Sequence, residues 1–293
     1  MNAIIKYPGA KWRIADWVIQ FFPKHHSYLE PFFGGGGVFF NKPRSNIETI
    51  NDLDGEVINL FECIRTDPER LAQQVLFTPY SREVYDCSYL NLSIENRFDR
   101  AVRFMVRCNM GHGFRSNGVK VGWKRDVVGR ERAYAAKAWC ELPNIILEAA
   151  ERLRGVQIEC RPATQLIEEY NHPNVLIYCD PPYLLSTRRG KQYRCEMTEE
   201  DHLQLLSALK KHTGPAIISG YLSDLYDSEL RGWHKETTTT TDLLSQVKKE
   251  VVWMNFEPRI QTTLFSENIV KGGIENGNDH PRAAAERKGV RQR

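Results

Sequence analysis

Residues Val175–Ser186 read VLIYCDPPYLLS. The apolar run VLIYC predicts a buried strand. Because proline fixes φ and carries no amide donor, Pro181 and Pro182 must end that strand. The ending leaves the carboxylate of Asp180, backbone carbonyls and the ring of Tyr183 at the carboxyl edge of a sheet. In open α/β sheets, ligands bind at this edge.

Short apolar strands alternate with amphipathic helices at both ends of the chain. This alternation predicts an α/β fold with a doubly wound, mostly parallel sheet. The helix with the clearest start signal follows Thr198, because Asp201 stands three residues later. We expect strands at residues 28–30, 47–50, 156–160, 175–179, 215–219 and 250–256, and helices at 164–170 and 198–212.

The middle of the chain differs from both ends. Residues 65–150 show helical periodicity and few strand signals, so we expect an inserted, mainly helical lobe. Within it, residues 115–121 read RSNGVKV, where the Asn-Gly pair favours the type I′ turn of a hairpin. Residues 1–64 and 151–265 would then form one sheet domain. Residues 266–293 are polar and are expected to form a disordered basic tail.

The chain has 293 residues, of which 41% are hydrophobic and 26% charged, as is typical of a globular protein. Its net charge of +3 is unevenly spread, because residues 97–137 contain eleven Lys and Arg but only three Asp and Glu. This basic stretch would suit a phosphate backbone, and a solvated helix face would also carry such charges. No window approaches the roughly 18 consecutive apolar residues of a membrane helix, and the start resembles no signal peptide. We therefore expect a cytoplasmic protein without membrane contact.

The seven cysteines give no sign of a metal centre or a disulfide framework. No two of them are closer than 16 residues in sequence, so a C-x-x-C zinc pair is absent. Their number is odd, and we expect reduced, mostly buried thiols and no metal site.

A glycine loop follows the first predicted strand. Residues 30–37 read EPFFGGGG, and glycines between a strand and a helix let the backbone approach a ligand. A dinucleotide fingerprint would need a further glycine where Phe39 stands, and no G-K-[ST] of a phosphate loop is present. The loop favours a nucleoside ligand with little phosphate, or an ordinary tight turn before the helix expected from Val38. Asp52 ends the next strand, where an acid can accept hydrogen bonds from ribose hydroxyls.

In this order, the motifs resemble those of a known family, the Dam-type, D12-class DNA adenine N6-methyltransferases, phage-borne members included. The likeness covers roughly residues 4–265. The matching stretches are KYPGAK at 6–11, EPFFGGGGVFF at 30–40, NDLD at 51–54, CDPPY at 179–183, IIS at 217–219 and KEVVWMN at 249–255. The resemblance implies a Rossmann-like sheet that uses S-adenosylmethionine (SAM), and an inserted DNA-recognition lobe. It also implies methyl transfer to N6 of adenine, flipped out of double-stranded DNA at a short specific sequence.

The resemblance further implies a catalytic tetrapeptide, Asp180, Pro181, Pro182 and Tyr183. Asp180 and the Pro181 carbonyl would accept hydrogen bonds from the target amino group, and Tyr183 would stack on the base. An exocyclic amine on adenine is a poor nucleophile because its lone pair is delocalised into the ring. Two acceptors aimed at its N–H groups would localise that lone pair.

The SAM site implied by the resemblance spans several motifs. Its residues would be Tyr7, Lys11, Phe32, Gly34, Gly36, Asp52, Thr164 and Asp180. Tyr7 and Lys11 would lie near the methionine moiety, and Asp52 would hold the ribose. Relatives often carry an acid before the catalytic strand, but here residues 161–165 read RPATQ, so Thr164 or Gln165 would be a neutral substitute.

The basic lobe would contact DNA. The residues expected there are Arg115, Asn117, Lys120, Lys124 and Arg125. By residue type, Arg115 and Asn117 are candidates for contacts to base edges, with ordinary turn polarity as the alternative.

Two other functions stay open on sequence alone. An N4-cytosine methyltransferase is one, although such relatives more often carry Ser in place of Asp180. A non-catalytic DNA-binding relative is the other. We expect a monomer, and both an independent enzyme and a member of a restriction–modification system fit the sequence.

Overall fold

The computed structural model describes residues 1–90, 93–127, 134–188, 190–241 and 247–258. Residues Met1–Arg259 form one compact unit. The predicted tail at 266–293 lies outside the described residues.

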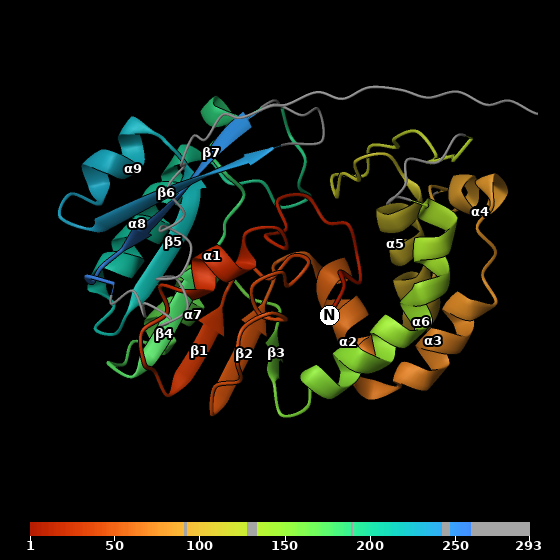
Figure 1. Cartoon of the computed structure of the whole chain (residues 1–293), viewed down its shortest axis with the longest axis horizontal. Helices are drawn as coiled ribbons and strands as arrows, with labels where there is room; N and C mark the ends of the chain where they lie inside the picture. The colour runs from red at the N-terminus through yellow and green to blue at the C-terminus, as the bar shows by residue number, and fades with distance from the viewer. Residues whose placement is uncertain (91–92, 128–133, 189, 242–246, 259–293) are drawn as a thin grey trace, which may run out of the picture. The chain divides into compact units, whose positions relative to one another are not determined.

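A seven-stranded sheet with the order β3-β2-β1-β4-β5-β7-β6 forms the centre of this unit (Figure 1). The parallel strands are β1 (Ser27–Glu30), β2 (Ile47–Asn51), β3 (Gln157–Glu159), β4 (Val175–Cys179) and β5 (Ala216–Tyr221). The antiparallel strands are β6 (His234–Thr241) and β7 (Val247–Met254), of which β7 pairs with β5. The predicted α/β class and the mostly parallel sheet are confirmed, and the sheet is compatible with a Rossmann-like methyltransferase.

The strand order changes direction between β1 and β4. From β1 the chain builds outward through β2 and β3, whereas β4 and β5 extend the sheet to the other side. The two strands are paired in parallel, with Ser27 opposite Val175 and Leu29 opposite Ile177. Their carboxyl ends, which lead into the glycine loop and into Asp180, therefore flank the crevice where open α/β sheets bind ligands.

Helices cover both faces of the sheet, because the strands bury side chains on both. In β4, Leu176 and Tyr178 belong to one core cluster and Val175, Ile177 and Cys179 to the other. This continuous apolar pattern is typical of a parallel strand buried on both faces. The first cluster contains side chains of α1 (Ala15–Ile19) and α2 (Gly55–Thr66), and the second those of α7 (Ala163–Glu169), α8 (Glu199–Lys211) and α9 (Asp224–Glu229).

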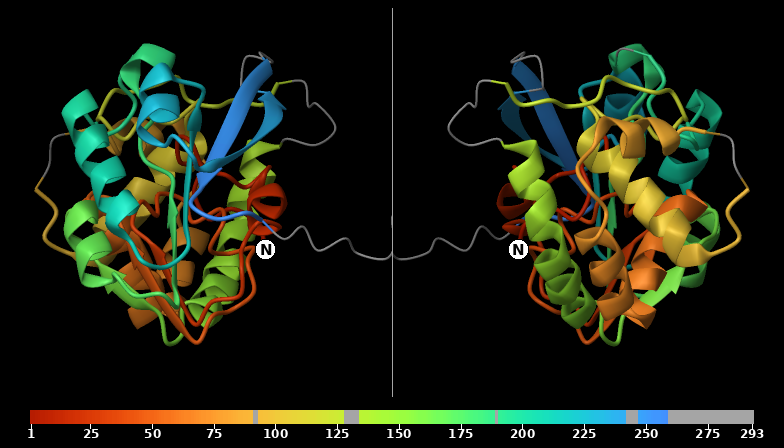
Figure 2. Two further views of the ribbon diagram at one scale, coloured as in Figure 1. Left: turned by 90° about the vertical axis from the view of Figure 1, so that its left-hand side faces the viewer. Right: turned by 90° about the vertical axis from the view of Figure 1, so that its right-hand side faces the viewer.

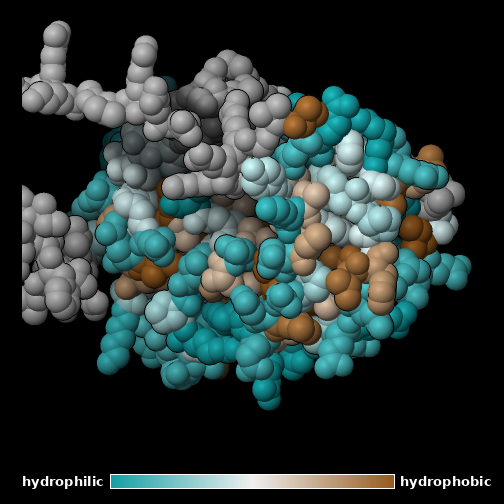
Figure 3. Space-filling model, turned by 45° about the vertical axis from the view of Figure 1, so that its right-hand side comes forward, coloured by the Kyte–Doolittle hydropathy of each residue, from teal (hydrophilic) through white to brown (hydrophobic). Residues whose placement is uncertain are grey.

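Four helices lie between β2 and β3 in sequence after α2. They are α3 (Pro68–Leu76), α4 (Arg82–Cys87), α5 (Arg97–Met110) and α6 (Ala135–Arg152), and they gather on one side of the molecule (Figures 1 and 2). Turned toward the viewer, this side is mostly hydrophilic, with hydrophobic side chains scattered over it (Figure 3). These helices belong to the same compact unit as the sheet, and their separation as a lobe stays a prediction.

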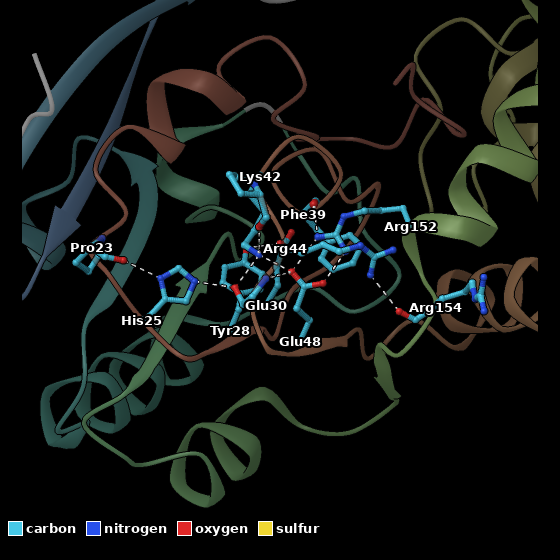
Figure 4. A network of polar contacts seen from close by, with 12 residues as sticks. Pro23, His25, Tyr28, Glu30, Phe39, Lys42, Arg44, Glu48, Arg152 and Arg154 are labelled. Carbon is cyan, nitrogen blue, oxygen red and sulfur yellow. Dashed lines mark hydrogen bonds and ion pairs between the residues drawn. The ribbon is translucent and has the colours of Figure 1, made fainter. Parts of the chain in front are cut away.

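A buried ion network fastens the end of α6 to the sheet (Figure 4). Glu48 on β2 accepts hydrogen bonds from Arg152 at 2.6 and 2.9 Å and from Lys42 at 2.5 Å. Arg152 also donates to the Phe39 carbonyl at 3.1 Å, and Arg44 donates to the Glu151 carbonyl at 2.6 Å. Removal of one partner from a buried ion pair strongly destabilises a protein, because the other charge is left without compensation. The network therefore holds the end of α6 against the sheet.

Two local predictions are wrong. The helix expected after the glycine loop is a run of turns over residues 37–41, and Pro43 follows it, which disfavours helical backbone just before. Residues 115–121 form no paired strands, and the nearest pairing is a single antiparallel bridge from Gly111 to Trp123. The N–H groups of Ser116 and Asn117 donate instead to the Gln192 carbonyl.

No helix in the described part of the chain is both long and apolar enough to span a bilayer. Among the same residues, no group of three or more His, Cys, Asp or Glu side chains is placed to hold a metal ion.

Candidate active site

A cavity of about 400 Å³ lies at the switch point of the sheet. Segments far apart in sequence build its wall: the N-terminal turn at 7–11, the glycine loop at 30–38, the end of β2 at 51–54, the start of α7 at 161–164, and residues 193–197. Asp180 and Pro182 complete the wall after β4. The structure therefore brings the sequence motifs together around one space.

Asp180 and Lys11 form a buried ion pair at the edge of this cavity. The Lys11 ammonium lies 2.8 Å from Oδ1 and 2.9 Å from Oδ2 of Asp180. Burial alone would lower the pKa of Lys11, but the charges of Asp180 and Glu250 raise it overall. The Lys11 side chain therefore keeps its charge beside Asp180.

Ser219 adds a second donor to the Asp180 carboxylate. Its hydroxyl donates to Oδ1 at 2.9 Å, whereas Oδ2 receives a hydrogen bond only from Lys11 within the described residues. Because each carboxylate oxygen can accept two hydrogen bonds, Oδ2 keeps capacity for a donor on a ligand.

The rest of the catalytic tetrapeptide is placed differently. Pro182 lines the cavity, but Pro181 and Tyr183 are not among the described residues that do. Within the described part of the chain, no hydrogen bond reaches the Pro181 carbonyl, so this acceptor is available. The Tyr183 hydroxyl donates to Glu250 at 2.7 Å, and its ring centroid lies 4.7 Å from the Lys11 ammonium.

The glycine loop is held by Asp52. The Gly34 N–H donates to Oδ2 at 2.7 Å and the Asp54 N–H to Oδ1 at 2.8 Å. Burial raises the pKa of Asp52 to about 7. Gly34 has a φ of +49° and lines the cavity with Phe32 and Asp52.

Gly36 has a packing role in this loop. Its φ is +66°, and an added Cβ would lie 2.6 Å from the Phe33 ring and 2.7 Å from the Phe40 ring. Gly36 is not among the described residues that line the cavity. The predicted contact of Gly36 with a cofactor has no support in this placement.

Tyr7 and Thr164 line the cavity, as does Lys11. The Tyr7 hydroxyl lies 3.2 Å from Ser116 Oγ and 3.4 Å from Asp54 Oδ2. Thr164 is a neutral side chain at the start of α7. The predicted cofactor residues other than Gly36 therefore share one wall.

Several lining residues were missed by the sequence analysis. Burial raises the pKa of Glu30 to about 8, and the Tyr28 hydroxyl donates to its Oε2 at 2.5 Å. Asn51 ties three segments together, because it donates to the Pro31 and Arg161 carbonyls and accepts the Arg161 N–H.

The loop at 193–197 was also missed, since it carries no periodic pattern or motif. It is attached to the helical region by the Arg194 N–H, which donates to Ser116 Oγ at 2.9 Å, and to the end of β2 by the Arg194 guanidinium, which lies 3.3 Å from Asp54. Ser116 thus contacts the loop that closes one side of the cavity.

The residues predicted to contact DNA have varied surroundings. Arg115 is exposed and forms no hydrogen bond or ion pair with the described residues. The Asn117 amide donates to the Lys191 carbonyl at 3.0 Å, so it already has a structural partner. Lys120 pairs with Asp86 at 2.8 Å, Lys124 is partly buried and Arg125 is exposed.

The cavity is acidic. Six carboxyl side chains line it (Glu30, Asp52, Asp54, Asp180, Glu196 and Asp201), against the two cations Lys11 and Arg161. Burial raises the pKa of Glu30 to about 8 and that of Asp52 to about 7, so these two are not fully ionised at neutral pH. The remaining carboxyl groups still outnumber the cations, which favours a ligand that carries positive charge and disfavours a polyphosphate.

Comparison with known proteins gives a family. The model of the D12 class N6 adenine-specific DNA methyltransferases matches residues 7–251. The chain is 26% identical over 232 residues to a DNA adenine methylase of Salmonella typhi, and 27% identical over 233 residues to one of Escherichia coli (strain K12). Each alignment covers 75% of this chain and 81% of the relative.

A shorter alignment relates the chain to the Type II methyltransferase M1.LlaDCHI of Lactococcus lactis subsp. cremoris, with 30% identity over 130 residues, 40% of this chain and 44% of the relative. These relatives do not support the predicted likeness to phage-borne members of the family. The family match favours adenine over the N4-cytosine and non-catalytic alternatives. The chain therefore belongs to the D12 class N6 adenine-specific DNA methyltransferases, and its reaction is methylation of the N6 amino group of adenine in DNA.

Proposed function

We propose that the cavity binds SAM and that the target adenine enters beside Asp180 after it has rotated out of the DNA duplex. The observation that carries this proposal is the position of the Asp180–Lys11 pair at the rim of an acidic cavity built by the family's motifs. The carboxyl groups of the cavity wall support SAM as the cofactor, because SAM carries a sulfonium and an ammonium but no phosphate.

Each part of the cavity would have a task in holding the cofactor. Asp52 would accept hydrogen bonds from the ribose hydroxyls, as an acid after the second strand does in dinucleotide folds. Thr164 would contact the adenine ring as a neutral partner, and Tyr7 would lie at the methionine end. Gly34 keeps the backbone close to the ligand because it has no side chain.

The chemistry asks little of the protein beyond positioning. SAM, when bound, supplies a methyl group on a sulfonium centre that is already reactive. Asp180 Oδ2 and the Pro181 carbonyl would accept hydrogen bonds from the N6 amino group and localise its lone pair. Since positive charge develops on this amine, the Asp180 carboxylate would stabilise the transition state more than the ground state.

The adenine cannot reach this site inside a duplex, so it would have to leave the base stack. Extrusion costs a few kcal/mol, and stacking on an aromatic ring returns about 1–3 kcal/mol per base. Tyr183 would supply that ring. The Lys11 ammonium lies 4.7 Å from the centroid of this ring. It would therefore lie next to the base when the base stacks on Tyr183.

The helical region at 65–150 would be the target-recognition lobe. Its basic stretch would hold phosphates, and exposed Arg115 would contact a base edge. The contact between Ser116 and residues 192–194 would place this lobe next to the bound cofactor. We propose that the enzyme acts on double-stranded DNA as a monomer.

The test is methyl transfer from labelled SAM to unmethylated duplex DNA, followed by digestion to nucleosides. Label in N6-methyladenosine is the expected result, and label in N4-methylcytosine would overturn the proposed substrate. Calorimetric titration of the chain with SAM tests the cofactor separately. Absence of binding at millimolar SAM would overturn the assignment of the cavity.

A further inference from the structure

A buried carboxylate stands behind the catalytic tetrapeptide. Glu250 lies on β7 opposite Tyr221 of β5, and its exposed fraction is 8%. Its neighbours in the strand, Val251 and Val252, are fully buried and apolar. A carboxyl group at such a position costs stability unless it is paired, so packing alone does not account for an acid here.

The partner of Glu250 is Tyr183. The phenol donates to Oε2 of Glu250 at 2.7 Å, between residues that are 67 positions apart in sequence. Burial raises the pKa of Glu250, which the charge of Lys11 opposes. Burial also raises the pKa of Tyr183 far above its usual range, so the proton of this hydrogen bond stays on the phenol.

The Tyr183 ring is restrained on three sides. Its hydroxyl is bound to Glu250, its backbone follows two prolines, and the Tyr221 ring meets it edge-on with centroids 4.7 Å apart. Removal of the Glu250 acceptor would leave the hydroxyl buried without a partner and would free the ring to turn about its side-chain bonds.

We infer that Glu250 is a positioning residue of the methyl transfer: it fixes the plane of Tyr183 through the phenol and thereby sets the surface on which the target adenine stacks. A phenol that donates to a carboxylate also has a more electron-rich ring, which favours a base that gains positive charge during the transfer. The inference rests on the proposed role of Tyr183 as the stacking residue. It gives Glu250 no contact with the reacting atoms.

The experiment compares Glu250→Ala, Glu250→Gln, Tyr183→Phe and the double variant Tyr183→Phe/Glu250→Ala under single-turnover conditions. Glu200→Gln, an exposed acid in the first turn of α8, is the matched control. Because small errors of placement cost about 10- to 100-fold in rate, we expect Glu250→Ala to lose that much with an unchanged dissociation constant for SAM. Glu250→Gln keeps an acceptor and should retain most of the rate.

A second readout follows the base itself. A duplex with 2-aminopurine at the mapped target adenine reports stacking through its fluorescence lifetime, with no need for methyl transfer. A short-lived stacked component is expected with the wild-type chain and with Glu250→Gln, and its loss with Glu250→Ala. In Tyr183→Phe, the added Glu250→Ala change should leave both rate and lifetime as they are.

Independent effects of the Tyr183 and Glu250 substitutions on the methylation rate would overturn the inference. If the rate losses of Tyr183→Phe and Glu250→Ala multiply in the double variant, Glu250 does not act through the phenol. An unchanged lifetime in Glu250→Ala would overturn the inference as well. Should Glu250→Ala not fold, Glu250→Met, which removes the acceptor but keeps most of the volume, replaces it in the same comparisons. If the wild-type chain itself methylates no adenine, the proposed function and this inference fall together.

Discussion

The Lys11 ammonium lies 2.8 Å from Oδ1 and 2.9 Å from Oδ2 of Asp180, although 169 positions separate the two residues in the chain. Their exposed fractions are 5% and 16%, so neither charge could be kept there without the other. The pair fixes the carboxylate in place before any ligand arrives. Preorganised electrostatic stabilisation of a transition state requires this arrangement.

Replacement of Lys11 by Met tests the pair. The variant keeps most of the side-chain volume but leaves Asp180 buried without its cation, which we expect to cost about 3 kcal/mol in the free energy of unfolding. Methyl transfer should fall more than about 100-fold. The double variant Lys11→Met/Asp180→Asn should recover stability in urea unfolding but no activity. Activity within fivefold of wild type in Lys11→Met would contradict this role.

The Asp180 carboxylate can be tested against one of its supports. Asp180→Ala should lower the single-turnover methylation rate by more than about 100-fold, while calorimetry still detects SAM binding. Ser219→Ala removes only one hydrogen bond to Oδ1, so we expect a loss of about fivefold. Equal losses in the two variants would show that Ser219 does more than orient the carboxylate.

The sequence predicted those parts of the fold that depend on local signals. The prolines at 181 and 182 end β4 as expected, and the Thr198–Asp201 pair forms the reciprocal cap of α8. Strand β6 escaped prediction, because the threonines at 237–241 show no alternation of apolar and polar residues. The glycine loop was recognised, but the helix expected after it is a run of turns, because Pro43 disfavours helical backbone just before it.

Contacts between distant segments could not be predicted. Nothing near Glu250 in the sequence distinguishes it from an exposed acid on an edge strand, and only the pairing of β7 with β5 brings it to Tyr183. The loop at 193–197 reaches the cavity through hydrogen bonds to Ser116, which a hairpin prediction for the same stretch could not reveal.

The pH dependence of SAM binding should report Asp52. Burial raises its pKa to about 7, so the carboxyl is largely protonated at pH 6 and ionised at pH 8. An ionised carboxylate is the better acceptor for ribose hydroxyls, and the affinity for SAM should therefore fall by up to about tenfold per pH unit below the pKa. Calorimetry at pH 6 and pH 8 measures this change. In Asp52→Asn the slope should vanish, and a slope as steep as that of wild type would contradict the assignment.

Glu30 should make the stability of the protein depend on pH. Burial raises its folded-state pKa from the ordinary 4.5 to about 8, so between these values unfolding releases a proton. The stability that Glu30 contributes is complete below about pH 4.5 and is lost as the pH rises through 8, by up to about 1.4 kcal/mol per pH unit. Urea unfolding of wild type and Glu30→Gln at pH 5, 7 and 8.5 measures it. We expect the variant to gain stability relative to wild type as the pH rises, and Glu200→Gln to gain none.

Arg115 and Asn117 should affect different steps, although they lie two positions apart. Arg115 is exposed and without a partner among the described residues, whereas the Asn117 amide holds the Lys191 carbonyl beside the cavity. Arg115→Ala should weaken DNA binding and relax sequence preference at one base pair by about 1–3 kcal/mol if it reads a base edge, or reduce the salt slope by about 1 if it holds a phosphate. Asn117→Ala should raise the dissociation constant for SAM and leave sequence preference alone, because it loosens the loop at 191–197. Binding titrations at several salt concentrations, with Lys211→Ala at the exposed end of α8 as the control, separate these outcomes. A change of sequence preference in Asn117→Ala would show that its amide exchanges the Lys191 carbonyl for a base when DNA binds.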